Sequence, residues 1–107
     1  MQTDNFRRIE DAIRRKRIVT GRYHGHYREM CPHTLGWSKT GKEHALFYQF
    51  AGTSDSGLAP DGSYQNWRCI DLAELTDVAI TDGLWHTAAN HNRKQTCVAV
   101  VHVEVAY

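Results

Sequence analysis

The stretch RYHGHYREMCPHTLG, residues 22–36, carries histidines and arginines at high density. It places His24, His26 and His33 close to Arg28. Clustered imidazoles are typical of a metal site or of acid–base chemistry, whereas a guanidinium is typical of an anion site. His24 and His26 would share a face of a regular strand, but the glycine between them favours a turn tip from which the two rings diverge. The sequence therefore predicts no metal site here, and it gives His33 a role in shaping a pocket or turn.

The nucleophilic side chains are not framed for catalysis. Cys31 and His33 could make a nucleophile and a base, but no glycine-rich oxyanion turn adjoins a cysteine. Ser54 and Ser56 lie in a loop-like stretch without the strand–turn–helix frame of a nucleophile elbow. No pair of carboxylates is placed as an acid and a base. We expect a protein that is not an enzyme, and a small hydrolase or nuclease is the least favoured alternative.

The cysteines indicate a reducing compartment. Cys31, Cys69 and Cys97 are odd in number, widely spaced and never in a C-x-x-C pair. A disulfide framework and a tetrahedral zinc site are both disfavoured, so we expect reduced and mostly buried thiols. The N-terminus has no apolar signal segment, and no apolar run is long enough to span a bilayer. We expect a cytoplasmic protein with no cofactor and no membrane partner.

Composition favours one globular domain over residues 1–107. Hydrophobic residues make up 41% of the chain and charged residues 23%, with a formal net charge of +1. The charge is unevenly placed, because bases outnumber acids in residues 1–30 while acids outnumber bases in residues 51–85. An electropositive N-terminal half could attract anions, although a solvated basic helix face would give the same charge pattern in the sequence.

The elements that must position these side chains begin with a helix, predicted over residues 4–17. Apolar residues recur there at helical spacing: Phe6, Ile9, Ala12 and Ile13. One of the polar residues 3–5 can cap its start, and basic residues in the last turn suit the helix dipole.

Extended segments follow the helix. They are predicted at 17–23, 27–36, 43–52, 66–72, 76–83 and from 96 to the end of the chain. The first two read as a hairpin, with Pro32 at an edge, a bulge or a strand end. The third is apolar on both faces, as a central strand would be, and a long loop follows it over 52–66. One helix followed by five or six short strands predicts a small, bent antiparallel sheet or barrel that is mostly β.

The C-terminal segment alternates in hydropathy. Its predicted buried face consists of Ala99, Val101, Val103 and Val105. Such a period of two is typical of a strand with one face against the core.

The order of these pieces resembles the WYL domain family. The matching stretches are RRKRIVTGRYHGHYREMCPHTLG, ALFYQFAG and NWRCIDLAEL, within about residues 8–82. Leu46-Phe47-Tyr48 stands on the strand that carries the family's name-giving Trp-Tyr-Leu triplet. The resemblance implies an Sm- or SH3-like barrel with a polar and basic pocket for a negatively charged effector, often proposed to be nucleic acid.

Most relatives in that family join the domain to a helix-turn-helix domain in bacterial transcription regulators. The single N-terminal helix of this chain cannot be such a domain. The resemblance therefore implies a free-standing regulator or a subunit of a partner regulator protein.

The arginines that match the family pattern define the expected site. The predicted ligand residues are Arg28, Tyr48, Gln49 and Arg68, with Tyr23 and His33 at the margin. Guanidinium forks match phosphate oxygens, and tyrosines can stack on bases. The alternative is that the two arginines pair with surface acids.

The function we expect is a non-enzymatic, effector-binding regulatory module for an anion such as a nucleotide or a short single-stranded nucleic acid. The alternative is a protein interaction or oligomerisation domain, acting through an exposed sheet edge and the 52–66 loop. A homodimer is included in that alternative, and Trp85 could lie at its interface.

Overall fold

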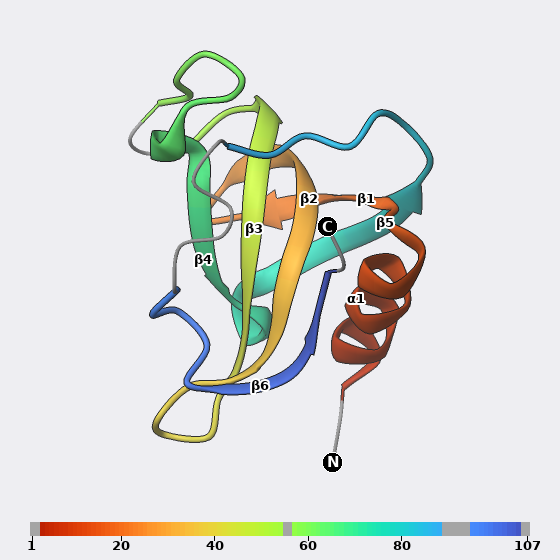
Figure 1. Cartoon of the computed structure of the whole chain (residues 1–107), viewed down its shortest axis with the longest axis vertical. Helices are drawn as coiled ribbons and strands as arrows, with labels where there is room; N and C mark the ends of the chain where they lie inside the picture. The colour runs from red at the N-terminus through yellow and green to blue at the C-terminus, as the bar shows by residue number, and fades with distance from the viewer. Residues whose placement is uncertain (1–2, 55–56, 89–94, 106–107) are drawn as a thin grey trace.

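The computed structural model describes residues 3–54, 57–88 and 95–105 (Figure 1). The elements are α1 (Asp4–Arg15), β1 (Ile18–Tyr23), β2 (His26–Trp37), β3 (Glu43–Gly52), η1 (Tyr64–Asn66), β4 (Trp67–Asp71), η2 (Leu72–Glu74), β5 (Leu75–Thr81) and β6 (Val100–Glu104). The strands form one antiparallel sheet in the order β4-β3-β2-β1-β5, and β6 pairs with the far end of β2. The prediction of a mostly-β fold with an N-terminal helix is confirmed.

Helix α1 forms where its apolar stripe predicts. The Thr3 side chain caps it by accepting a hydrogen bond from the Phe6 backbone N–H. The helix ends two residues before the predicted boundary, because Lys16 adopts a left-handed conformation with φ of 52°. Its buried stripe consists of Phe6, Ile9, Ala12 and Ile13. This stripe packs on the sheet and defines the core.

The predicted hairpin is confirmed. β1 and β2 are joined by His24 and Gly25, both at positive φ, which is the backbone that a tight two-residue hairpin turn requires. The register between β2 and β3 shifts between Pro32 and Thr34, so the proline sits at a bulge, one of its three predicted places. β3 lies between β2 and β4, as expected of a central strand.

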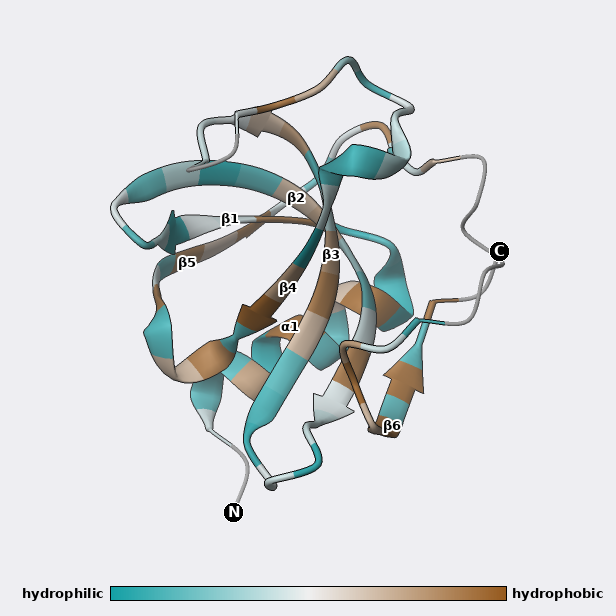
Figure 2. Ribbon diagram, turned by 90° about the vertical axis from the view of Figure 1, so that its left-hand side faces the viewer, coloured by the Kyte–Doolittle hydropathy of each residue, from teal (hydrophilic) through white to brown (hydrophobic). Residues whose placement is uncertain are grey.

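The core lies between α1 and one face of the sheet, which we call the inner face. Met30, Phe47 and Ile70 are fully buried on it. Figure 2 shows apolar residues concentrated in β4 and in the middle of β3, while the lower end of β3 is hydrophilic. No helix in the described part of the chain is long and apolar enough to cross a membrane.

The C-terminal strand departs from the predicted alternation. Val103 and Val105 do pack against the core, but Val101 is 48% exposed. Just before the strand, Val98 is buried in place of Ala99. The cause is a bulge in β6: Leu35 pairs with Val103 and Gly36 pairs with Val101, so the extra residue His102 changes the phase of the alternation.

The prediction that all three cysteines are reduced and mostly buried is wrong for two of them. Cys69 on β4 and Cys97 form a disulfide, with their Cα atoms 5.5 Å apart. Cys69 is exposed and Cys97 is half-buried, whereas Cys31 is free and buried as expected. Cys97 lies against β3, where its Sγ is 3.5 Å from the Ala45 carbonyl oxygen, and this position brings it beside β4. Sequence spacing does not reveal a contact between segments so far apart in the chain.

Candidate functional site

Three of the predicted ligand residues share the inner face near the end of the sheet where β3 leaves for the 52–66 loop. Arg68 on β4 lies opposite Phe47, a core residue of β3. Gln49 is two residues further along β3 and lies opposite Met30 of β2. Arg28 is two residues from Met30, so alternation gives it the same face. The sheet register therefore brings Arg28, Gln49 and Arg68 together.

These three residues form a hydrogen-bonded group, which we call the arginine cluster. Gln49 Oε1 accepts from Arg28 Nη1 at 3.4 Å and from Arg68 Nε at 3.2 Å. Gln49 Nε2 donates to the carbonyl oxygens of Ala51 at 3.1 Å and Thr53 at 3.0 Å. Gln49 is fully buried and Arg28 is only 4% exposed. One buried amide thus holds two cationic groups side by side.

Tyr23 borders the arginine cluster. Arg28 Nη2 donates to the Tyr23 carbonyl oxygen at 3.2 Å, and the Arg28 guanidinium carbon lies 5.3 Å from the centre of the Tyr23 ring. The Tyr23 hydroxyl accepts from the Asp71 backbone N–H at 3.2 Å, which fixes the ring between β1 and β4. Burial raises the pKa of Tyr23 above its ordinary value.

Arg68 ties the 52–66 loop to β4. Its Nη1 donates to the carbonyl oxygens of Gln65 at 2.7 Å and Trp67 at 3.2 Å. Its Nη2 donates to Ser54 Oγ at 3.2 Å and to the Gly57 carbonyl oxygen at 3.0 Å. Every acceptor is a neutral oxygen, and Arg68 forms no ion pair with any residue that the structure describes.

The electrostatics of Arg68 follow from this setting. Burial first, and then the positive charge of Arg28, lower the pKa of Arg68 from its ordinary value, because each disfavours the charged form. The guanidinium remains protonated at neutral pH. Because burial and Arg28 both disfavour the charged form of Arg68, a negatively charged ligand beside it would stabilise that form.

A hollow adjoins Arg68 on the loop side. Its volume is about 420 Å³, and its lining residues are Gly57, Leu58, Ala59 and Gln65. Gly57 and Gln65 are also two of the residues that accept hydrogen bonds from Arg68. The guanidinium and the hollow are therefore held by the same loop.

Tyr48 does not join the arginine cluster. It lies opposite Trp67 and is adjacent to Gln49 on β3. Its side chain therefore points to the face of the sheet opposite the inner face, which we call the outer face. The fully buried Tyr48 hydroxyl accepts from the Gly62 backbone N–H at 2.7 Å and donates to the Ser63 carbonyl oxygen at 3.0 Å. In this structure Tyr48 anchors the loop from the opposite side.

His33 lies with Tyr48 on the outer face. Its ring packs edge-on against Trp67, with the two ring centres 4.7 Å apart, and it is only 1% exposed. His33 Nδ1 donates to the Cys31 carbonyl oxygen at 2.8 Å, and His33 Nε2 lies 3.1 Å from Thr87 Oγ1. The six predicted residues thus divide into an inner group of four and an outer pair.

The Cys31 side chain is fully buried and packs as a small hydrophobic residue. It accepts a hydrogen bond from the His86 backbone N–H at 3.3 Å. Burial raises the pKa of the Cys31 thiol to about 11, so it is protonated at neutral pH. His33 contacts the backbone of Cys31, as described above. This geometry does not favour a cysteine–histidine nucleophile.

The histidines of the hairpin turn diverge, as predicted. His24 Nε2 lies 3.3 Å from a Glu74 carboxylate oxygen, while His26 Nδ1 lies 2.9 Å from Thr53 Oγ1. Their partners belong to different segments, so the two rings do not converge on one ion.

Two further clusters of polar side chains, around His86 and around His44, were not predicted from the sequence. His86 Nδ1 lies 2.8 Å from Asp61 Oδ2, and the His86 ring stacks on Phe50 with the ring centres 4.0 Å apart. His44 lies beside the Cys69–Cys97 pair, treated below. Each group joins segments distant in sequence, and no local pattern marks either of them.

Comparisons with protein-family models, with curated proteins and with solved structures found no significant match to this chain. The likeness to the WYL family stays a prediction from sequence, and the function is argued below from geometry.

Proposed function

We propose that this chain is a non-enzymatic, effector-binding regulatory module that takes an anion at the arginine cluster. The ligand class we propose is a nucleotide or a short single-stranded nucleic acid. One observation carries the proposal. Two guanidiniums share the amide oxygen of Gln49, and Arg68 is met only by neutral oxygens among the described residues.

The proposed binding step is an exchange of hydrogen-bond acceptors. A phosphate oxygen takes the place of Ser54 Oγ and of the Gly57 carbonyl oxygen at Arg68 Nη2. Charge-assisted hydrogen bonds are shorter and roughly twice as strong as neutral ones, so the exchange is favourable. The negative charge also offsets the repulsion between Arg28 and Arg68.

The surroundings of Arg68 suit the rest of such a ligand. The hollow beside Gly57 offers room for a sugar or a base. Tyr64, next in the chain to Gln65, is 68% exposed and presents an aromatic surface. Stacking of a base on an aromatic side chain contributes about 1–3 kcal/mol. The resemblance to the WYL family supports the same site, because Arg28 and Arg68 match its pattern.

The test is fluorescence-polarisation binding of a labelled single-stranded oligonucleotide and of a labelled nucleotide, at low and at physiological salt. We expect saturable binding that weakens as salt rises. Arg68→Gln should abolish it. Arg22→Gln is the matched control, because Arg22 is an exposed arginine of β1 that pairs with Asp77.

Circular dichroism must first show that each variant is folded. Binding lost in Arg68→Gln and kept in Arg22→Gln supports the proposal. If the folded wild type binds neither probe at either salt, or if both variants lose binding equally, the proposal is contradicted.

A second candidate, an interaction or self-association domain, is favoured by β6. Val100 and Val101 on this strand are 57% and 48% exposed, and β6 pairs only with β2 among the described elements. Such an edge can pair with another strand. If this candidate holds, light scattering will show a dimer that Val101→Lys converts to monomer, while Arg68→Gln leaves it intact. A monomer at all concentrations would contradict it.

A further inference from the structure

Three side chains that can bind a metal ion, one imidazole and two sulfurs, lie together on the face of the sheet opposite the arginine cluster. His44 lies on β3, Cys69 on β4, and Cys97 in the segment that leads into β6. His44 lies opposite Asp71, two residues along β4 from Cys69, so His44 and Cys69 are diagonal neighbours on one face. A ligand nitrogen of His44 and the two Sγ atoms all lie within 4.8 Å of one another.

The group is open to solvent and adjusts easily. Cys69 is exposed, and the other two residues are half-buried. His44 Nδ1 is 3.5 Å from the Cys97 carbonyl oxygen, the long limit for a hydrogen bond. Side-chain rotation can therefore redirect the ring without disturbing the strands. In Figure 1 the blue segment before β6 runs beside β4, so both sulfurs belong to segments already in contact.

The oxidation state decides what these sulfurs can do. A dithiol reductant cleaves the Cys69–Cys97 bond by supplying two electrons and two protons, and it becomes a disulfide itself. The chain then carries two thiols beside an imidazole. In a reducing compartment such thiols are typical metal ligands.

We propose that the reduced chain binds one Zn²⁺ ion through Cys69, Cys97 and His44, with the fourth position open to water. The ion takes the two sulfurs as thiolates, so binding releases two protons to solvent. Zinc prefers thiolate and imidazole ligands in tetrahedral geometry, with Zn–S bonds of about 2.3 Å and so sulfurs about 3.8 Å apart. In the oxidised chain the two sulfurs are bonded to each other, so they must move apart to that spacing after reduction, while a ligand nitrogen of His44 already lies within 4.8 Å of both.

This site has a structural consequence. The disulfide ties the segment before β6 to β4. A zinc ion on the same two sulfurs keeps that tie when the covalent bond is absent. The inference is independent of the proposed anion site, since the two share no residue.

The experiment titrates Zn²⁺ into the reduced 107-residue chain under anaerobic conditions, in competition with a chromogenic chelator. Co²⁺ is then used as a spectroscopic probe, because thiolate ligation gives a near-ultraviolet charge-transfer band. We expect tight binding of one ion per chain, and its loss in Cys69→Ser and in Cys97→Ser. His44→Ala should weaken it.

Two variants serve as controls. Cys31→Ala removes the buried thiol, and His86→Ala removes a half-buried histidine that packs on Phe50, toward the other end of β3 from His44; both should keep the affinity. The inference is overturned if wild type binds no tighter than Cys69→Ser, if Cys31→Ala abolishes binding, or if His44→Ala leaves the affinity unchanged.

Circular dichroism covers the case in which the reduced chain unfolds. Recovery of the native spectrum on addition of Zn²⁺, in wild type but not in His44→Ala, would support the site. An unfolded reduced chain that Zn²⁺ fails to restore would overturn it.

Discussion

Gln49 is the residue that holds the arginine cluster together. Its amide oxygen accepts from two guanidiniums and its amide nitrogen donates to two carbonyl groups, so its usual hydrogen-bonding capacity is filled. A buried polar side chain with this many partners stabilises the fold only while its partners remain.

We predict that Gln49→Leu lowers the free energy of unfolding by about 3 kcal/mol, because it leaves two charged donors short of an acceptor. Urea denaturation measures the change. Gln65→Leu is the control, since the exposed Gln65 contributes only its backbone oxygen to Arg68, and it should cost less than about 0.5 kcal/mol. Equal small losses in both variants would contradict the role given to Gln49.

Cys31 makes the free energy of unfolding vary with pH in the alkaline range. Its pKa is raised from 9.0 to about 11 in the folded chain, so the unfolded chain loses the proton first. The stability contributed by the neutral thiol is complete below pH 9. It falls by about 1.4 kcal/mol per pH unit as the pH rises from 9 towards 11.

Denaturation below pH 9 and again near pH 11 tests this prediction. Wild type should lose more stability over that interval than Cys31→Ala. The raised pKa of Tyr23 acts in the same direction in both proteins, so the difference between them reports the thiol. Equal losses in the two proteins would contradict the assignment.

At the scale of elements, β6 can approach β2 closely because residue 36 is a glycine and has no side chain. A Cβ atom on Gly36 would overlap the Val100 carbonyl oxygen and would lie 2.7 Å from Val98 Cγ1. We predict that Gly36→Ala costs about 1–3 kcal/mol and speeds hydrogen exchange in β6. Gly41→Ala strains its turn, where φ is 83°, but its Cβ meets no atom within 4 Å, so it controls for a loss of stability without a clash at β6, and exchange in β6 should rise less than in Gly36→Ala. Unchanged exchange in Gly36→Ala would contradict this close approach.

Helix α1 is joined to β6 through Glu10, which contacts His102 of β6 and forms an ion pair with Arg14 of its own helix. Glu10 Oε1 lies 3.0 Å from His102 Nε2, and Glu10 Oε2 accepts from Arg14 at 2.8 Å. The hydrogen bond from Arg14, followed by the one from His102, lowers the pKa of Glu10 below its usual 4.5. The ionised carboxylate therefore stabilises the fold above pH 4.5, and this contribution is lost as the pH falls through the lowered pKa.

We predict that Glu10→Gln lowers the thermal midpoint at neutral pH and that its difference from wild type disappears in acid. The effect is small, under about 1 kcal/mol, because the pair is partly solvated. Asp11→Asn breaks only the Asp11–Arg15 pair on the exposed side of α1, so it controls for helix charge. A difference that persists in acid would contradict the ion-pair account.

The elements could be predicted from sequence because their signals are local. The stripe of α1, the turn at His24 and Gly25, and the apolar β3 each lie within a few residues. The site could be predicted only in part. Tyr48 and Gln49 are adjacent on a strand and point to opposite faces. The register shifts between β2 and its neighbours β3 and β6, and the Cys69–Cys97 bond, depend on long-range pairing. None of these long-range features leaves a local pattern.

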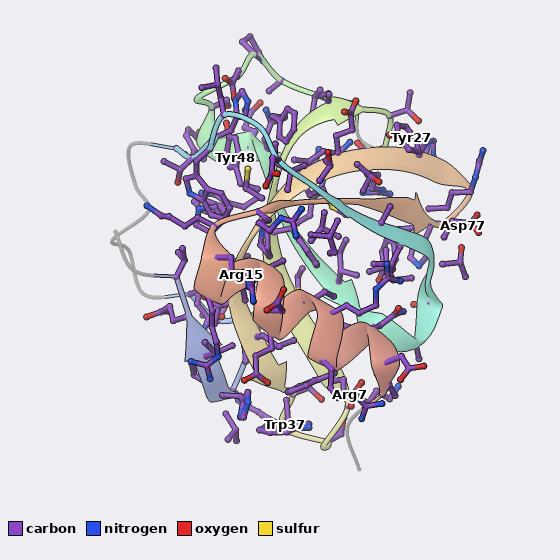
Figure 3. All side chains as sticks on the ribbon, turned by 90° about the vertical axis from the view of Figure 1, so that its right-hand side faces the viewer. Arg7, Arg15, Tyr27, Trp37, Tyr48 and Asp77 are labelled. Carbon is purple, nitrogen blue, oxygen red and sulfur yellow. A yellow bond between two sulfur atoms is a disulfide. The ribbon has the colours of Figure 1, made fainter. Side chains whose placement is uncertain are left out.

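At the scale of the whole molecule, ion pairs link the basic N-terminal region both to its own acids and to the acidic stretch of residues 51–85. Arginines of the basic N-terminal region pair with acids: Arg7 with Asp4, Arg14 with Glu10, Arg15 with Asp11, Arg17 with Asp82 and Arg22 with Asp77. Figure 3 shows Arg7 and Arg15 on α1, in front of the sheet. Arg28 on β2 and Arg68 on β4 belong to other elements than these helix arginines, so the arginine cluster is a separate source of positive potential.

The most direct test of the account is an NMR titration of ¹⁵N-labelled protein with a single-stranded oligonucleotide and, separately, with a nucleotide. It follows the Arg68 Nε–H, the Gln49 side-chain amide and the Gly57 backbone amide. Binding at the arginine cluster predicts that these signals shift together and saturate, while the amides of α1 stay in place. Shifts confined to α1, or no shift with either ligand, would contradict the account.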